Sequence, residues 1–196
     1  LGQFQDGYLN VRGLTRRLTQ VNTQISIPFI LSSKGYGLLW NNYGLTDFNP
    51  ADHKVEMLRT AAGGDEVTVN VTSTEGTKRE TRRDNVFKAV LDIEEDGQYA
   101  ILLDVGQKMA RRHNLSIDGT NVIEVRNVWL PPTTSIITEL KAGRHELTAE
   151  LERGASPTIY YRKTDDRTVF ASPVAECVDY TVFAGNADEI ISSYRA

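Results

Sequence analysis

Short runs of apolar or alternating residues recur along the whole chain, and turn residues separate them. Residues 67–72 (VTVNVT) alternate strictly, as a strand with one buried face does. Asp118-Gly119 stands between two apolar runs, and Gly143 lies in a turn between two more, which is typical of β-hairpins. The pattern predicts strands at residues 25–31, 36–40, 67–72, 87–93, 99–103, 115–117, 122–125, 136–140, 145–151, 158–161 and 180–183.

The runs at residues 25–31 and 36–40 are close enough to form a hairpin. Gly35 can take a positive φ in the turn between them. Pro28 has no N–H to donate, which indicates an edge position or a bulge. Many short strands with turns between them predict an all-β fold, a β-sandwich or jelly roll.

One helix is expected, at the C-terminal end. Asn186 can cap it, and Glu189 stands three residues later, where a capping box has its glutamate. Ile190, Ile191 and Tyr194 give this helix an apolar stripe.

Charge and composition limit the classes of partner that the chain can have. The chain has 196 residues, a net charge of -4 and a pI near 5.4, so we expect no nucleic-acid partner. The arginine pairs at residues 16–17, 82–83 and 111–112 are isolated, and we expect them to be solvated. No run reaches the apolar length of a membrane-spanning helix, so no membrane partner is expected.

The chemistry-bearing residues do not form a catalytic pattern. The acid clusters at residues 94–96 and 165–166 lie in turn-like segments, so no residue is assigned a catalytic role. His53, His113 and His145 lack the spacing of metal ligands, and neither a metal nor a cofactor is expected. Cys177 is the one cysteine, and its surroundings predict a buried small apolar side chain.

Both ends of the chain resemble glycoside hydrolase family 31, especially its bacterial α-xylosidase-like members. The resemblance rests on LGQFQDG at residues 1–7, NTQISIPF at 22–29, SSKGYGLLWNNY at 32–43, VDYTVFAG at 178–185 and DEIISSYR at 188–195. In the family these stretches belong to the late strands of the N-terminal β-sandwich and to the helix before the catalytic barrel. The resemblance therefore implies a β-sandwich portion at residues 1–50 and 168–196.

The middle of the chain, residues 51–167, is then expected to be an inserted β-domain. It resembles a PA14 domain, a jelly-roll-like module. The resemblance rests on Phe87, Asp96-Gly97 with Tyr99, IDG at 117–119, Trp129, and LKAG at 140–143 followed by His145. The insert is shorter than usual, and the paired-Asp calcium motif of the sugar-binding adhesin versions is absent.

The family implies retaining hydrolysis of α-linked xylosides or glucosides by two aspartates of the barrel. That barrel is expected beyond Ala196, and the opening without Met also suggests a part of a longer protein. We therefore expect a non-catalytic accessory region that supports the barrel and shapes the active-site rim. The barrel of the same polypeptide is the expected partner, and a periplasmic or secreted bacterial location is implied by the resemblance alone.

An oligosaccharide is the second expected partner. Aromatic faces and fixed polar groups bind sugars, and the candidates are Asn22, Thr23, Tyr36, Trp40 and Trp129. Asn22 and Thr23 are assigned to a loop that lines the rim. Tyr36 and Trp40 share a strand face, which is also how core residues are arranged. The alternative hypothesis is a purely structural or oligomerisation module without glycan binding.

Overall fold

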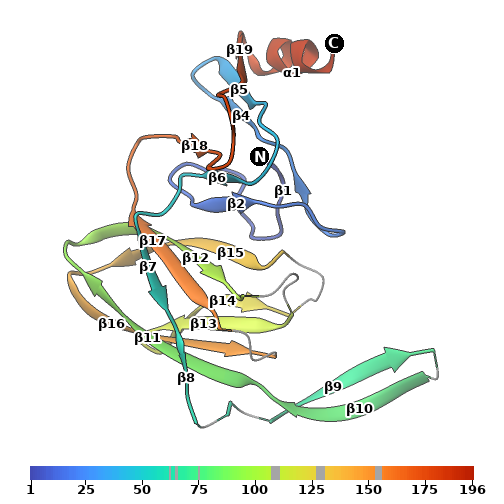
Figure 1. Ribbon diagram of the computed structural model, residues 1–196, viewed down its shortest axis with the longest axis vertical. Helices are drawn as coiled ribbons and strands as arrows, with labels where there is room; N and C mark the ends of the chain where they lie inside the picture. The colour runs from blue at the N-terminus through green and yellow to red at the C-terminus, as the bar shows by residue number, and fades with distance from the viewer. Residues whose placement is uncertain (62, 65, 75, 107–110, 127–130, 153–155) are drawn as a thin grey trace.

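The computed structural model describes residues 1–61, 63–64, 66–74, 76–106, 111–126, 131–152 and 156–196 (Figure 1). Strands dominate it, and its one helix, α1 (Ala187–Arg195), lies at the C-terminal end. The prediction of an all-β sandwich fold with a short C-terminal helix is confirmed. None of the helices in the described ranges is long and apolar enough to cross a membrane.

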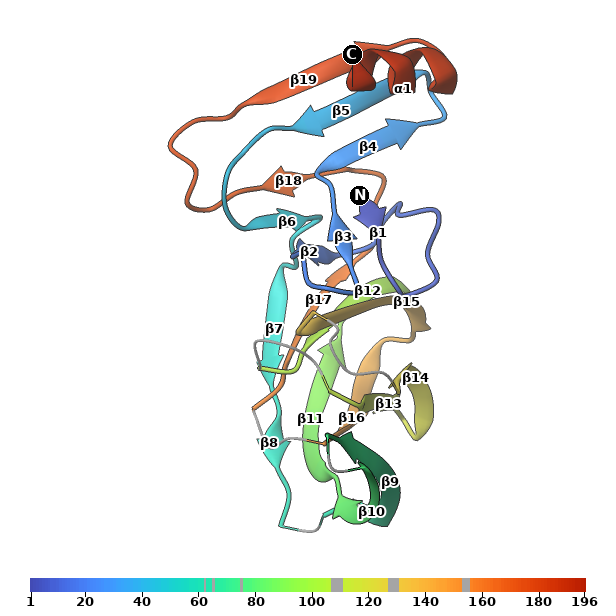
Figure 2. The ribbon, with the colours of Figure 1, turned by 90° about the vertical axis from the view of Figure 1, so that its right-hand side faces the viewer.

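Two antiparallel sheets face each other in the lower part of Figures 1 and 2. We call this part, with its two sheets, the core sandwich. The first sheet has the order β14 (Thr120–Val125), β13 (His113–Ile117), β16 (Gly143–Leu151), β11 (Asn85–Ile93) and β8 (Leu58–Arg59). The second has the order β15 (Thr133–Leu140), β12 (Gly97–Asp104), β17 (Thr158–Lys163) and β7 (His53–Glu56).

A single apolar core fills the space between these sheets. Phe87 and Leu91 both point into it from β11. They are four residues apart, and residues of a strand separated by an even number lie on the same face. Leu115 and Leu147, from β13 and β16, are 0% exposed. The hairpin of β9 (Glu66–Ser73) and β10 (Gly76–Arg83) extends away from this core as a separate two-stranded arm (Figure 1).

The two ends of the chain meet above the core sandwich in small sheets, which together with α1 we call the terminal unit (Figure 2). One sheet pairs β1 (Gly2–Gln3) with β3 (Ile25–Ser26). A second sheet has the order β18 (Phe170–Ala171), β6 (Thr46–Phe48) and β2 (Arg16–Leu18). The third has the order β19 (Tyr180–Ala184), β5 (Tyr36–Trp40) and β4 (Phe29–Ser32). β19 pairs with β5, so strands far apart in sequence are neighbours, as the resemblance led us to expect.

Helix α1 lies on one face of the sheet β19-β5-β4. The capping box is present: the Asn186 side chain accepts from the Glu189 N–H at 3.1 Å, and the Glu189 carboxylate accepts from the Asn186 N–H at 2.8 Å. Ile190 is buried over Gly37, where an added Cβ would lie only 2.8 Å from its Cγ2 atom. Gly37 therefore lets the helix approach the strand closely.

Two sequence expectations are corrected. The strand expected at residues 25–31 is two strands, β3 and β4, because Pro28 between them cannot donate to a ladder; its carbonyl accepts from the Trp40 N–H at 2.8 Å. Cys177 is exposed rather than buried, because it lies in the turn segment before β19 and not within a strand.

Candidate functional site

The predicted rim residues Asn22 and Thr23 form the tip of a tight turn. Val21 and Gln24 on either side exchange both backbone hydrogen bonds, at 3.2 and 3.1 Å. Asn22 and Thr23 are the two residues between them, and both are exposed. We call residues 21–24 the rim turn.

The first residues of the chain hold the rim turn in place. The Gln5 side-chain amide donates to the Thr23 carbonyl at 3.0 Å. Gln24 is only 5% exposed, and its own amide donates to the Thr19 carbonyl at 2.8 Å. Gly2, at φ 95°, pairs with Ser26, and a Cβ there would lie 2.2 Å from the Ile25 carbonyl oxygen, so no larger residue fits. Residues 1–7 therefore hold this turn in place, and we call them the brace.

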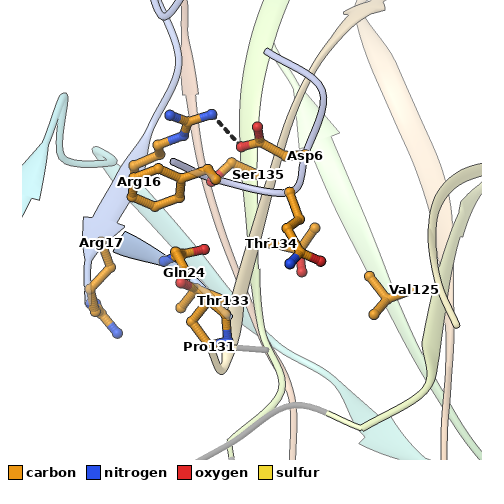
Figure 3. Close-up of a pocket in the computed structure, with 11 residues that line it drawn as sticks. Asp6, Arg16, Arg17, Gln24, Val125, Pro131, Thr133, Thr134 and Ser135 are labelled. Carbon is orange, nitrogen blue, oxygen red and sulfur yellow. Dashed lines mark hydrogen bonds and ion pairs between the residues drawn. The ribbon is translucent and has the colours of Figure 1, made fainter. Parts of the chain in front are cut away.

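Below the brace lies a small polar cavity between the terminal unit and the core sandwich (Figure 3). Its volume of about 40 Å³ admits a few water molecules and no sugar ring. Its lining comes from both parts of the molecule: Phe4, Gln5, Asp6, Arg16, Arg17 and Gln24 on one side, and Val125, Pro131, Thr133, Thr134 and Ser135 on the other.

Arg16 is the charged residue at this cavity that is most deeply buried. Its side chain is 3% exposed, forms an ion pair with Asp6, and lies over the Phe4 ring with 4.2 Å between guanidinium carbon and ring centroid. Burial lowers the pKa of Arg16, and the charge of Asp6 opposes that shift. Arg17 bonds to Asp47 and Asp104, which joins the terminal unit to β12. The expectation that this arginine pair is solvated is wrong, because each side chain has a carboxylate partner at the junction.

Tyr36 belongs to a different and larger pocket. This pocket has a volume of about 320 Å³, within the size range of small-molecule sites. Tyr36, which is 40% exposed, lines it together with the ion pair of Arg12 and Asp166. Lys34 contributes a further cation. An aromatic ring with several polar groups around a space of this size can accept one sugar ring.

Trp40 serves packing inside the terminal unit. Its indole N–H donates to the Ser172 hydroxyl at 2.8 Å, and its ring stacks on Phe170 with centroids 5.7 Å apart. The contacts favour the packing role over sugar binding for this residue. Trp129 lies outside the described residues. The remaining candidates therefore fall into two places, the rim turn and the Tyr36 pocket.

Several carboxylates of the two acid clusters accept hydrogen bonds that lower their pKa values. The hydrogen bond from Lys163 lowers the pKa of Glu95, and that from the Ala142 N–H lowers the pKa of Asp96. The hydrogen bond from Arg167 lowers the pKa of Asp165. In the described ranges, no group of three or more His, Cys, Asp and Glu side chains could hold a metal ion.

Sequence reasoning missed Gln5, Gln24 and the pair of Asp6 with Arg16. Gln5 and Gln24 lie within the quoted stretches at residues 1–7 and 22–29, but periodicity assigns neither of them a role. Asp6 lies within the quoted motif, and only the folded chain reveals that its partner stands ten residues later.

Parts of the chain are similar to known proteins of glycoside hydrolase family 31. No family model matches the chain. The "Alpha-xylosidase" of Saccharolobus solfataricus is 47% identical over 57 residues, and the "Uncharacterized family 31 glucosidase ORF2" of Pseudescherichia vulneris is 52% identical over 42 residues. These matches cover 29% and 21% of this chain and 8% of each relative. A solved GH31 alpha-xylosidase from Xanthomonas citri aligns over 99% of this chain and 25% of its own, with a TM-score of 0.68 and 20% identity.

Proposed function

We propose that this chain, which is similar to members of glycoside hydrolase family 31, is a non-catalytic accessory region of an α-xylosidase or α-glucosidase. In this role it supports the catalytic barrel of the same polypeptide, and its rim turn borders the active site. The observation that carries the proposal is the braced tip at Asn22 and Thr23. The chain spans 8% of the length of the curated relatives it matches, so the activity of the whole protein is itself part of the proposal.

A rim loop must hold its polar groups in place before the substrate arrives. Gln5 fixes the backbone of the rim turn, and the buried Gln24 anchors its base. Such preorganisation removes the ordering cost that a free loop would incur on binding. Asn22 can both donate and accept hydrogen bonds through its amide, as recognition of sugar hydroxyls requires.

The chemistry itself is assigned to the barrel. A glycosidase needs a general acid whose pKa is raised and a second carboxylate close by. Hydrogen bonds from Lys163, from the Ala142 N–H and from Arg167 lower the pKa values of Glu95, Asp96 and Asp165 respectively, so each stays ionised and is unsuited to donate a proton.

We further propose that the terminal unit comprises residues 1–50 and 168–196 and that residues 51–167 are an inserted, PA14-like domain. The proposal is supported by the sheet orders, in which the sheets of the core sandwich contain no strand from either end of the chain. A periplasmic or secreted location remains part of the proposal and rests on the family resemblance.

Oligosaccharide binding is assigned to the Tyr36 pocket, with one sugar ring against the tyrosine. The pocket is open to solvent on one side, so we expect weak binding, with a dissociation constant on the order of millimolar. The alternative is a structural module without glycan affinity, and a chain that shows no binding to xylo- or gluco-oligosaccharides would favour it.

The test of the rim role uses the complete parent enzyme. The double substitution Asn22→Ala/Thr23→Ala should lower kcat/KM for an oligosaccharide about tenfold, equivalent to about 1.4 kcal/mol of transition-state stabilisation. The matched control is Thr120→Ala/Asn121→Ala, which removes the same two side chains from an exposed hairpin of the core sandwich. Equal kcat/KM in both double variants would contradict the rim role.

A further inference from the structure

The Tyr36 pocket carries an uncompensated positive charge. Three charged side chains line it, those of Arg12, Lys34 and Asp166. Arg12 and Asp166 form an ion pair, so their charges offset each other. Lys34 is exposed, and among the residues that the structure describes its ammonium group has no carboxylate partner. The balance at the pocket is therefore one positive charge, although the whole chain has a net charge of -4.

The turn between β4 and β5 holds the backbone of Lys34 in place beside the pocket. The Lys34 N–H donates to the Ser32 hydroxyl oxygen at 3.2 Å, and the Gly35 N–H donates to the Ser32 carbonyl, also at 3.2 Å. Gly35 takes φ 83°, which closes the turn. A ligand at the pocket thus meets a cation whose backbone is already ordered.

Arg12 can accept a ligand without losing a strong interaction. Its contact with Asp166 is made by one nitrogen, Nη2, whereas a guanidinium group has five N–H donors. The two side chains are 66% and 87% exposed, and ion pairs that are so open to water contribute little to stability. A carboxylate is the ligand group that suits the remaining donors, because it accepts hydrogen bonds from guanidinium and ammonium groups alike.

The rest of the lining suits a sugar ring better than a small free anion. The exposed part of the Tyr36 ring can face the C–H groups of a pyranose, and the hydroxyl groups of Ser32 and Ser33 can bond to its hydroxyls. Ile30 and Phe48 add apolar surface. A volume of about 320 Å³ is far more than a single inorganic ion requires.

A second pocket of nearly the same size has the opposite charge. Its volume is about 330 Å³, and it lies at one end of the core sandwich. Asp96, Glu139 and Lys141 line it, which leaves one negative charge. The positive balance at Tyr36 is thus a property of that pocket and not of the protein surface in general.

We infer that the Tyr36 pocket selects an acidic sugar, a uronic acid unit whose carboxylate binds Lys34 and Arg12 while its ring lies against Tyr36. The inference rests on the proposed function, which assigns oligosaccharide to this pocket, and it adds the class of sugar. Asp166 is the carboxylate that opposes such a ligand, since it occupies one nitrogen of Arg12 and repels a second negative charge.

The test is a titration of the 196-residue chain, followed by the NMR shifts of the Tyr36 and Gly37 amides. The probes are a xylo-oligosaccharide with one glucuronic acid branch and the unbranched xylo-oligosaccharide of the same length. The dissociation constant of the acidic probe should be about fivefold lower, and at about 0.5 M salt the difference should shrink below about twofold. Equal dissociation constants at low salt would overturn the inference and leave oligosaccharide binding in place.

Two further outcomes are distinct. Acetate that shifts the same amides at the same concentration as the acidic probe would show a simple anion site and overturn the inference. If neither oligosaccharide binds, both the inference and the assignment of oligosaccharide to this pocket fail. The rim role is measured separately, because Asn22 and Thr23 do not line this pocket.

Substitutions of opposite sign give a second readout. Lys34→Gln should reduce the preference for the acidic probe below about twofold and leave the affinity for the neutral probe unchanged. Asp166→Asn should increase the preference at least about twofold, a gain that damage to the fold would not produce. The matched control is Lys54→Gln, which removes the same charge from an exposed position on β7. A Lys34→Gln chain that keeps the full preference would overturn the inference.

Discussion

The core sandwich and the terminal unit use apolar residues in opposite ways. Nearly all the buried apolar side chains of the described residues lie in the core sandwich, and the terminal unit adds Leu14, Phe48 and Ile190. Large exposed apolar side chains show the reverse: Leu58 is the example in the described part of the core sandwich, and the others belong to the terminal unit. The core sandwich buries its apolar surface within itself, whereas the terminal unit leaves much of its apolar surface exposed.

The largest effect should come from the same substitution made in each region. Leu147→Ala removes a side chain that is 0% exposed in the core and should lower the free energy of unfolding by about 4 kcal/mol. Leu45→Ala, at a 41% exposed site of the terminal unit, should cost less than about 0.5 kcal/mol in the chain alone. Chemical denaturation measures both, and similar costs would remove the contrast between the regions.

The next largest effect on stability is expected at the junction between the terminal unit and the core sandwich. Asp6→Asn leaves the buried Arg16 guanidinium without its counter-charge and should cost about 3 kcal/mol. Trp40 fluorescence reports on the terminal unit, and its unfolding transition should shift to lower denaturant concentration. The double variant Asp6→Asn/Arg16→Met should recover part of the loss, because it removes the unpaired charge. A double variant less stable than Asp6→Asn would show that the ion pair is not the cause.

The smallest effect should be a pH dependence confined to the core sandwich. Both ring nitrogens of His145 lie near acceptors: Nε2 is 2.8 Å from the Lys141 carbonyl, and Nδ1 is 2.6 Å from the Asp118 carboxylate. The Lys141 carbonyl, followed by Asp118, raises the pKa of His145 above 6.5. The resulting stabilisation is complete below pH 6.5 and is lost as the pH rises through the folded-state pKa.

Asp118 does not reverse this trend near neutrality, because His145 holds the pKa of Asp118 below its usual value and the carboxylate stays ionised. We expect the free energy of unfolding to fall by under about 1 kcal/mol from this pair as the pH rises. His145→Gln should remove the effect, and the control His53→Gln, at an exposed position, should retain it. An NMR titration in which the His145 ring titrates below pH 6.5 would contradict the assignment.

The sequence predicted most of the longer elements because their determinants are local, but β10 was missed because its residues, GTKRETRR, carry no apolar period. Alternation placed β9, and the residues of the capping box placed α1. The short strands β1, β2, β6 and β18 were not predicted, since two or three residues carry no period and their pairing depends on distant partners. Cys177 shows the same limit, because an apolar neighbourhood in sequence does not report where the segment lies.

The candidate site was predictable only in part. Asn22 and Thr23 followed from a motif. The structure adds how the turn is held: the Gln5 amide donates to the Thr23 carbonyl, and Val21 pairs with Gln24. The burial of Arg16 depends on surfaces contributed by β15, more than a hundred residues away in sequence. The sequence around an arginine pair does not predict that a distant strand such as β15 will cover it.

The strands by which the chain enters and leaves the core sandwich lie side by side. β7 and β17 are paired antiparallel, with His53 opposite Tyr161, so the two crossings form one narrow stem (Figure 1). Adjacent strands are only about 5 Å apart, a gap that two or three residues can span. Excision of the core sandwich would therefore leave two chain ends close enough to be joined without displacing the pairing of β6 with β18.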